Sequence, residues 1–213
     1  YLQDPATRLP VELLAPRAGE SVLDLCAAPG GKSLLLADLM TAGTAPNEST
    51  AGQLVAVDQP GVRIDRLKEN LSRAGNLDVA LVQADLLGPD VAGVLREHRL
   101  PSSFDAVLLD VPCSNTGVMR HRVDVKWRLQ PGDFRKHPQQ QLSMLHAAAR
   151  LVAPGGRLVY STCSIDAEEN EQVVRAFKAG KAGGPFTLEK TVVSQPWTAG
   201  HDGGGAFLLR RSA

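Results

Sequence analysis

Short apolar runs alternate along this chain with segments of helical spacing, and this alternation is the feature that most restricts its fold. Five runs have the pattern of buried strands, over residues 21–26, 53–58, 79–83, 104–110 and 157–162. Helical spacing occurs between them, at Ile64, Leu67, Leu71 and Ala74, and again at Leu142, Leu145, Ala149 and Val152. Strands that alternate with helices form a parallel sheet with helices on both faces. The sequence therefore predicts an α/β fold with a mostly parallel sheet.

Weaker patterns indicate how this fold ends. Residues 187–193 and 206–210 are strand candidates, and they predict an antiparallel strand that closes the sheet. The polar stretch 41–52 is typical of a surface loop. A chain of 213 residues with 43% apolar content suits one α/β core, so we expect a single domain over residues 1–213. Because the chain begins at Tyr1 rather than at methionine, we expect it to be part of a longer protein.

The composition excludes several classes of protein. No run of about 18 apolar residues is present, which argues against a membrane span. The cysteines are three, and none forms a C-x-x-C pair, which argues against a disulfide framework and a zinc site. We therefore expect a cytoplasmic, monomeric protein without a bound metal.

A glycine turn follows the first predicted strand. Residues 26–32, Cys26, Ala27, Ala28, Pro29, Gly30, Gly31 and Lys32, lead from this strand into a helix. The Walker phosphate loop needs a glycine six positions before its lysine, and that position is Cys26, so a nucleotide triphosphatase is excluded. Small residues let the backbone approach a ligand, and the new helix offers free N–H groups to an anionic group. A simple tight turn between strand and helix is the alternative.

Acidic residues stand at the ends of three predicted strands, where ligands of such sheets bind. Asp58 is placed to accept hydrogen bonds from ribose hydroxyls, although a helix N-cap is an equally ordinary role for it. Asp85 is placed to accept from an adenine amino group, and Asp110 ends the fourth predicted strand. An adenosine without phosphates but with a carboxylate tail is S-adenosylmethionine. We therefore expect S-adenosylmethionine as the cofactor.

Two cysteines lie at the same edge of the predicted sheet. Cys113 follows a proline in a polar loop, and Cys163 lies at the end of a later strand. Neighbouring strands would bring both thiols into one cleft, and free thiols at a ligand-binding edge indicate covalent chemistry.

The segment after Cys113 is rich in basic residues although the chain has no net charge. Two acids, Asp124 and Asp133, oppose six cations: Arg120, Arg122, Lys126, Arg128, Arg135 and Lys136. This run indicates either a solvated surface or contacts with the phosphates of RNA, with Arg120, Arg122 and Lys126 as the expected contacts.

Three long motifs resemble the RsmB/NSUN family of RNA cytosine-5 methyltransferases. They are L-D-L-C-A-A-P-G-G-K at 23–32, L-L-D-V-P-C-S-N-T-G-V at 108–118 and Y-S-T-C-S-I-D-A-E-E-N-E at 160–171. The opening stretch 1–10 also resembles the family, and R-H-R-V-D-V-K-W at 120–127 is closer to its bacterial ribosomal RNA branch. One departure is D-G-G-G-A-F at 202–207, where the family often has D-G-F-F. The N-terminal RNA-binding region of the family lies outside this chain.

The resemblance implies a Rossmann-like methyltransferase fold and a reaction. It implies a cofactor site built from residues 26–32 with Asp58, Asp85 and Asp110, to which Arg63 adds a contact. It also implies that Cys163 attacks C6 of a cytosine and that Cys113 helps to release the product. Asp110, as a protonated or proton-sharing group in a closed apolar cleft, would contact N3 and N4 of the base.

The expected substrate is ribosomal RNA with its cytosine unstacked in a single strand or loop. A transfer RNA substrate, a non-catalytic RNA-binding relative and a DNA cytosine-5 methyltransferase are the alternatives. In the DNA enzymes the thiol that follows proline, here Cys113, is the nucleophile.

Overall fold

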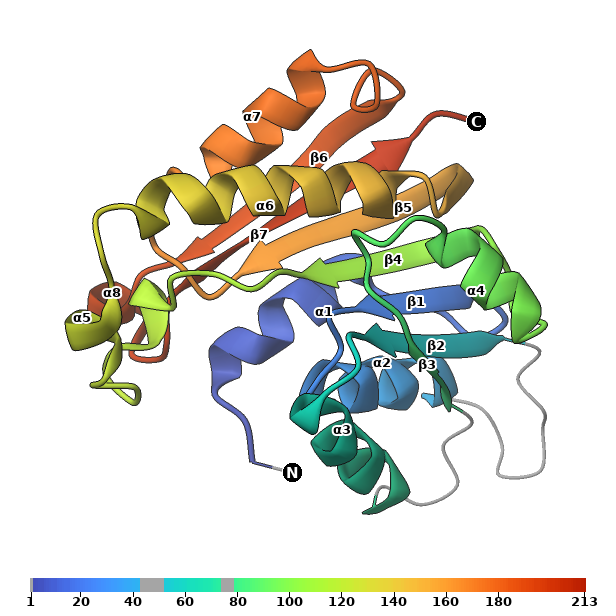
Figure 1. Ribbon diagram of the computed structural model, residues 1–213, viewed down its shortest axis with the longest axis horizontal. Coiled ribbons are helices and arrows are strands. Elements are labelled where there is room, and N and C mark those ends of the chain that lie inside the picture. Colours follow the sequence, from blue (N-terminus) through green and yellow to red (C-terminus); the bar gives the residue numbers. More distant parts are fainter. Residues whose placement is uncertain (1, 43–51, 74–78) are drawn as a thin grey trace.

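A seven-stranded sheet forms the centre of the protein in the computed structural model, which describes residues 2–42, 52–73 and 79–213 (Figure 1). The strand order is β3-β2-β1-β4-β5-β7-β6. Neighbours from β3 to β5 are parallel, whereas β7 is antiparallel to both β5 and β6. This topology confirms the predicted parallel sheet with a closing antiparallel strand. The strands are β1 Ser21–Leu25, β2 Gln53–Asp58, β3 Val79–Gln83, β4 Phe104–Asp110, β5 Val152–Thr162, β6 Phe186–Ser194 and β7 Gly204–Arg211.

Helices cover both faces of the sheet because successive strand side chains point to opposite sides. In β1, Leu23 and Leu25 pack with α4, α6 and α7, whereas Val22 packs with α1 and α2. Helix α3 packs through Ile64 on the same face as α2. No described helix is long and apolar enough to cross a membrane. The helices are η1 Pro5–Arg8, α1 Leu9–Leu14, α2 Gly31–Thr41, α3 Val62–Arg73, α4 Val91–Glu97, η2 Thr116–Val118, α5 Val125–Arg128, α6 Asp133–Ala149, α7 Glu171–Ala179 and α8 Pro196–Ala199.

Two expected boundaries were wrong. Val152 begins β5, where it pairs with Phe104, and does not continue the preceding helix. Pro154 cannot join a helical hydrogen-bond ladder and Gly155 has a φ of 73°, so the chain leaves the helix before them. Cys26 lies outside β1 with a φ of 60°, so this strand ends one residue earlier than expected. Ala74 and most of the predicted loop 41–52 lie outside the described residues.

Arg157 of β5 fastens the N-terminal helix to the sheet. Its guanidinium donates to the carbonyl oxygens of Leu14 (2.6 Å) and Ala15 (2.8 Å), at the C-terminal end of α1. It also binds both carboxylate oxygens of Glu20, at 2.8 and 2.6 Å. Only 9% of the Arg157 side chain and 18% of the Glu20 side chain are exposed. Although burial opposes it, the Arg157 hydrogen bond holds the pKa of Glu20 below its ordinary value. Arg157 therefore supplies hydrogen-bond donors to two carbonyl oxygens at the end of α1, at a place largely closed to water.

We expect Arg157→Ala to lower the free energy of unfolding by about 3 kcal/mol, because it leaves a carboxylate and two carbonyls without their partner. Urea denaturation at neutral pH measures this change. Arg210→Ala is the matched control, since its pair with Glu189 is 41% and 37% exposed. We expect it to cost less than about 1 kcal/mol. Equal losses in the two variants would contradict a special role for Arg157.

Candidate active site

The glycine turn lies between β1 and α2 and has a backbone that few residue types can adopt. Cys26 has a φ of 60° and Gly30 a φ of 102°, and the bond between Ala28 and Pro29 is cis. The positive φ of Gly30 favours glycine there, and a Cβ would also lie 2.8 Å from Leu67 Cδ1 of α3, so that side chain would have to move.

Side chains from the next strand and helix hold this turn. Asp58 accepts a hydrogen bond from the Ala28 N–H (2.8 Å), and Arg63 donates to the Ala28 carbonyl (2.6 Å). Asn70 donates to the Pro29 carbonyl at 2.7 Å. The other oxygen of Asp58 accepts from the Gln59 N–H, so neither of these two hydrogen bonds comes from the first turn of α3. The helix N-cap alternative for Asp58 therefore has no support in the structure.

Asp24 is a buried acid that the sequence reasoning missed. It lies on β1 and faces α2, where Ser33 donates to its Oδ2 at 2.6 Å. Its Oδ1 is buried, and none of the described residues offers it a hydrogen bond. Burial, only partly offset by the Ser33 hydrogen bond, raises the pKa of Asp24 to about 7. The available signal was an acid inside an otherwise apolar strand.

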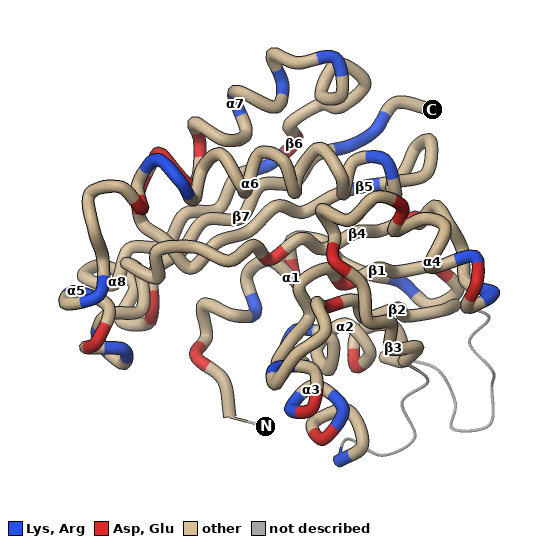
Figure 2. The backbone as a smooth tube through the Cα atoms, in the orientation of Figure 1, with Lys and Arg blue, Asp and Glu red and all other residues tan. Residues whose placement is uncertain are grey.

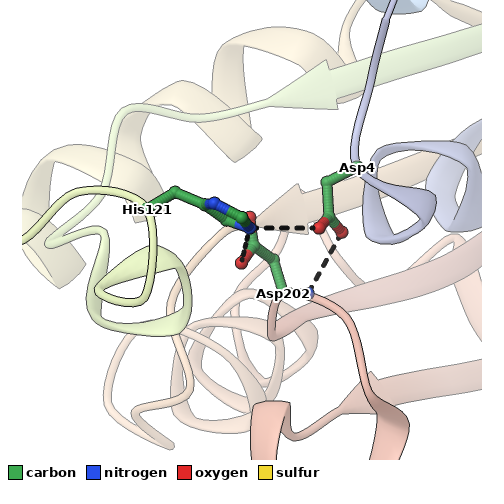
Figure 3. Close-up of side chains that lie close together, drawn as sticks. All are labelled: Asp4, His121 and Asp202. Carbon is green, nitrogen blue, oxygen red and sulfur yellow. Dashed lines mark hydrogen bonds and ion pairs between the residues drawn. The ribbon is translucent and has the colours of Figure 1, made fainter.

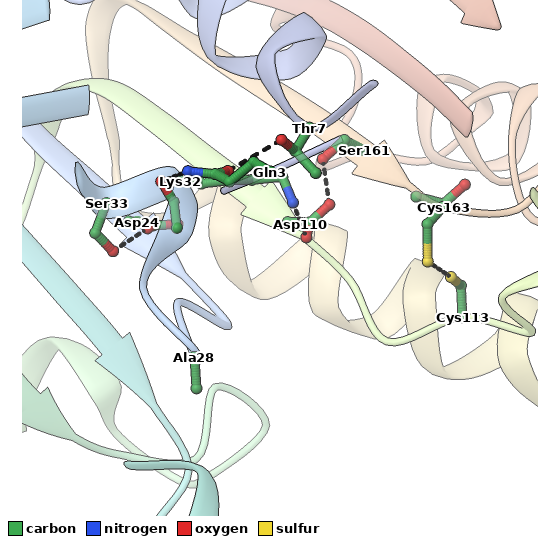
Figure 4. A network of polar contacts seen from close by, with 12 residues as sticks. Gln3, Thr7, Asp24, Ala28, Lys32, Ser33, Asp110, Cys113, Ser161 and Cys163 are labelled. Carbon is green, nitrogen blue, oxygen red and sulfur yellow. Dashed lines mark hydrogen bonds and ion pairs between the residues drawn. The ribbon is translucent and has the colours of Figure 1, made fainter. Parts of the chain in front are cut away.

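A cavity beside the turn brings several predicted residues together. Gln3 of the N-terminal segment closes it by donating to the Gly31 carbonyl at 3.0 Å, and Thr7 donates to Gln3 at 3.0 Å (Figure 4). The residues that line this first cavity are Leu2, Gln3, Thr7, Asp24, Cys26, Ala27, Ala28, Pro29, Gly31, Lys32 and Asp110. The cavity thus presents backbone groups of the glycine turn together with Asp24 Oδ1, an oxygen that can still accept a hydrogen bond.

An ion pair joins α2 to the end of β4. Lys32 Nζ lies 2.7 Å from Asp110 Oδ2, and Ser161 of β5 donates to Asp110 Oδ1 at 2.7 Å (Figure 4). Burial lowers the pKa of Lys32, but the Asp110 carboxylate outweighs it and raises this pKa above its ordinary value. Both oxygens of Asp110 accept hydrogen bonds and one of them faces a cation. The expectation that a closed apolar cleft surrounds Asp110 is therefore wrong.

The two thiols of interest face each other. Cys113 Sγ lies 3.0 Å from Cys163 Sγ, and the Cys163 thiol lies 3.2 Å from Asn115 Oδ1 (Figure 4). The hydrogen bond to Cys163, together with burial, raises the pKa of Cys113 well above its ordinary value. Cys163 is less buried than Cys113. The prediction that neighbouring strands bring both thiols to one place is confirmed.

A second cavity opens beside Cys163 and shares Lys32, Asp110 and Thr7 with the first. One wall is the segment Asp202 to Ala206, and Val118 contributes to the lining. A Cβ at Gly204 would overlap the Thr162 carbonyl, and one at Gly205 would overlap Asn170 Oδ1. The backbone in this segment is therefore packed too closely for side chains, which accounts for glycines where the family often has aromatics.

Buried polar residues around the thiols form a network that the sequence reasoning left without a role. Glu169, fully buried, accepts from the Ser114 N–H at 3.0 Å and from Gln141 at 2.7 Å. Asn170 accepts from the Thr162 hydroxyl at 2.8 Å and donates to the Ser164 carbonyl at 2.8 Å. These bonds fix the loops that carry Cys113 and Cys163. The signal was the run of polar residues directly after a buried strand.

The structure separates Asp85 from the first cavity. Asp85 is exposed, and its Oδ1 accepts from the Leu87 N–H (2.9 Å) and from Gln59 (3.0 Å). It lines a different cavity, together with Gly88 and Val91. Gln59 connects Asp85 to Asp58, and Asp58 in turn binds the glycine turn.

The expected RNA contacts Arg120, Arg122 and Lys126 lie on the exposed segment between η2 and α6. Arg120 has a structural contact of its own, because it donates to the Gly200 carbonyl at 3.0 Å. Arg122 lies 3.6 Å from Asp124, and both side chains are about half exposed.

A cluster of two acids and a histidine holds three segments together (Figure 3). His121 Nε2 lies 3.4 Å from Asp202 Oδ1 and 3.7 Å from Asp4 Oδ2. The Asp202 N–H donates to Asp4 Oδ1 at 3.1 Å. The three side chains are close enough to offer ligand atoms to one cation. Arg120, 3.9 Å from Asp202, already supplies positive charge, so we interpret the cluster as a clasp between the N-terminal segment, the basic segment and the turn before β7.

Comparison with known proteins gives a match over most of the chain. The family described as 16S rRNA methyltransferase RsmB/F matches residues 11–198. The ribosomal RNA small subunit methyltransferase B of Cronobacter sakazakii is 40% identical over 182 residues, which cover 83% of this chain and 37% of that protein. The probable ribosomal RNA small subunit methyltransferase B of Bacillus subtilis is 37% identical over 176 residues, covering 83% of this chain and 36% of that protein. The chain thus spans a little over a third of the length of these relatives.

Solved structures share the fold. NSun6 from Pyrococcus horikoshii, with SFG, superposes with a TM-score of 0.82 at 26% identity, over 100% of this chain and 53% of that one. A methyltransferase homolog protein from the same organism has a TM-score of 0.78 at 27% identity, over 99% of this chain and 68% of that one. These likenesses confirm the methyltransferase fold that the motifs implied.

We expect the stability of the protein to depend on pH through Asp24. A carboxyl whose pKa is raised on folding binds its proton more tightly in the folded state, so its contribution to the free energy of unfolding falls as pH rises from about 4 to about 7. Asp24→Asn removes this titration. Urea denaturation at pH 5 and pH 8 should show that the variant gains stability relative to the unmodified protein at the higher pH. A difference between the two proteins that is the same at both pH values would contradict the assignment.

Proposed function

Because the chain belongs to the 16S rRNA methyltransferase RsmB/F family, we propose that residues 1–213 are a catalytic domain that methylates C5 of a cytosine in ribosomal RNA. The paired thiols carry this proposal: Cys113 and Cys163, 3.0 Å apart, beside the Lys32–Asp110 pair. Two free thiols at one strand edge suit a reaction in which one sulfur bonds to the base and the other assists its release. The relatives named as methyltransferases of small-subunit ribosomal RNA support RNA as the substrate.

The residues of the first cavity fit S-adenosylmethionine as the cofactor. The buried Asp24 Oδ1 without a partner suits the cationic amino-acid end of that molecule, and the small residues of the turn leave their backbone accessible. Each Asp58 oxygen accepts one hydrogen bond from the protein, which leaves acceptor capacity for ribose hydroxyls. Residues 26–32, Asp58, Arg63 and Asp110 would hold the cofactor, whereas Asp85, which lines a different cavity, is left out of this site. When bound, it supplies the methyl group.

Cys163 is the proposed nucleophile. Cys113 has a pKa raised well above its ordinary value, so it keeps its proton and can donate it toward the Cys163 sulfur. The cationic Lys32 lines the same cavity as Cys163. The Cys163 sulfur then forms a bond to C6 of the base, which makes C5 nucleophilic.

Release reverses this addition. After C5 carries the methyl group, its proton passes to the Cys113 sulfur while Cys113 gives its own proton to the Cys163 sulfur, the bond between C6 and that sulfur breaks, and the C5–C6 double bond re-forms. Cys113 is placed to assist this step because its sulfur lies 3.0 Å from that of Cys163.

Asp110 and Lys32 are proposed to orient the base. A carboxylate whose two oxygens already accept hydrogen bonds suits the N4 amino group of cytosine as a further donor. The proton held between Lys32 and Asp110 is the available source for N3. In this arrangement Asp110 acts with Lys32 rather than as an isolated protonated acid.

The basic segment is proposed to contact RNA phosphates through Arg120, Arg122 and Lys126. All three side chains belong to exposed residues. Arg122 and Lys126 are the better candidates, because Arg120 already binds the Gly200 carbonyl.

We expect Asp58→Ala to weaken S-adenosylmethionine binding by about 1.5 to 3 kcal/mol, the range for a hydrogen bond to a charged group. Isothermal titration calorimetry measures the affinity, with ATP as a ligand that should not bind. Asp65→Ala, an exposed acid on α3, is the matched control and should bind as the unmodified protein does. An affinity unchanged by Asp58→Ala would remove Asp58 from the cofactor site.

We expect the two cysteine variants to fail at different steps. Cys163→Ala has no sulfur to attack C6, so it should be inactive and bind RNA only reversibly. Cys113→Ala should complete attack and methyl transfer but stall before release, and so accumulate a protein–RNA adduct. Incubation of each variant with cofactor and a cytosine-containing RNA, followed by denaturing electrophoresis, separates these outcomes.

The unmodified protein is the control, because it completes release and should form no lasting adduct. A stable adduct from Cys163→Ala and none from Cys113→Ala would reverse the two roles, as in the DNA cytosine-5 methyltransferases.

A further inference from the structure

Both tryptophans of the chain are largely exposed. Trp127 on α5 is 79% exposed and Trp197 on α8 is 68% exposed. A tryptophan that leaves its ring in water forgoes one of the largest gains available from burial in a core. Two such residues on one surface therefore indicate a partner that covers them.

The two helices are held close to one another. Arg120, just before α5, donates to the carbonyl of Gly200, just after α8, at 3.0 Å. The clasp of His121 with Asp202 makes a second connection between the same two segments. Figure 1 shows α5 and α8 beside each other at one end of the molecule. The tryptophans thus belong to one surface.

Local structure keeps the Trp127 ring outside. Val125 of α5 is fully buried and anchors the helix. A residue two positions further along an α-helix lies about 200° around the axis, so Trp127 points away from the core. Pro196 and Gly200 bound α8 and restrict its conformation.

Positive charge surrounds this surface. Lys126 Nζ lies 4.9 Å from the centre of the Trp127 ring. Arg122 and Arg128 both approach one carboxylate, Asp124, at 3.6 and 4.0 Å, so residues 122–128 keep an excess of two positive charges. Figure 2 shows basic positions near α5 and α8, at one end of the molecule. Exposed aromatic rings among cations are what single-stranded nucleic acid requires, because bases stack on the rings and phosphates pair with the cations.

The surface continues directly from the cavity beside Cys163. Val118 lines that cavity and lies two residues before Arg120. On the other side, Asp202 and Gly203 line it and lie just after α8. The two segments that carry the tryptophans therefore start from two walls of the same cavity.

We propose that Trp127 and Trp197 form a platform on which nucleotides flanking the target cytosine stack. This inference rests on the proposed function and extends it, because it assigns recognition of a single strand next to the base in the cavity. Stacking on an aromatic ring accepts any base, so the platform binds an unpaired strand and selects against a duplex whose bases are already stacked.

Binding of a fluorescently labelled single-stranded RNA that contains one cytosine tests the platform. Trp127→Ala and Trp197→Ala should each lower the affinity about fivefold or more, the loss expected for one stacked base. Trp127→Phe should keep most of the affinity, since a phenyl ring still stacks. Intrinsic tryptophan fluorescence should be quenched by the RNA. Leu188→Ala, on β6 and 42% exposed, is the matched control and should bind as the unmodified protein does.

Salt dependence separates stacking from charge. Alanine at each tryptophan should leave the dependence of affinity on salt unchanged, whereas a variant with Arg122→Ala and Lys126→Ala should flatten it. Unchanged RNA affinity in both tryptophan variants, or equal losses for Trp127→Ala and Trp127→Phe, would overturn the proposal. So would a full-length protein in which both tryptophans are closed to a soluble quencher, because another part of the polypeptide would then be their partner.

The outcome is independent of the reaction itself. If methyl transfer is absent but RNA affinity depends on both rings, the proposed reaction fails and the platform stands. If methyl transfer occurs and both rings are dispensable for RNA binding, the platform alone fails.

Discussion

The ion pair between Lys32 and Asp110 is the contact on which the arrangement of the site depends. It links the helix that follows the glycine turn to the end of β4, and Ser161 extends it to β5. The lysine and aspartate side chains are 20% and 29% exposed, so each charge relies on the other more than on water. Both cavities of the site are lined by this pair. A change at either residue would therefore disturb the proposed cofactor and base sites together.

Hydrogen bonds between buried polar groups hold the loops that carry the two thiols. Glu169, Asn170 and Gln141 are buried and engaged with backbone or side chains of the loops that carry the thiols. Buried polar groups are costly without partners, so such a network fixes one arrangement of the loops. Rigid loops are what the proposed chemistry needs, because two chemically equal thiols must act differently. Their surroundings supply the difference, since Cys113 is the more buried of the two and Cys163 is the one that also contacts Asn115.

Contacts outside the site hold the segments that surround it. The N-terminal segment reaches the glycine turn through Gln3, and the Asp4–His121–Asp202 cluster ties it to the basic segment and to the turn before β7. Arg157 fixes the C-terminal end of α1, the helix that follows that N-terminal segment. The outer surface of the same region carries both exposed tryptophans. The elements that shape the cavity beside Cys163 are thus the ones that present the proposed RNA platform.

The sequence by itself determined the sheet, the family and the order of the motifs. Strands β2 and β4 begin and end where their apolar runs do, because burial on both faces leaves a continuous apolar signal, and the edge strand β3 also has the expected bounds. The motifs around Cys26, Cys113 and Cys163 are local strings, and the family match confirms them.

Only the tertiary structure decided the contacts between residues that are far apart in the chain. Asp24 looked like one polar residue in an apolar strand, and only its packing against α2 left an oxygen without a donor. Asp58 turned out to hold the glycine turn, and Asp110 to face a lysine 78 positions away. Such pairings depend on strand order and register, which bring distant side chains within hydrogen-bond reach and leave no periodic trace in the sequence.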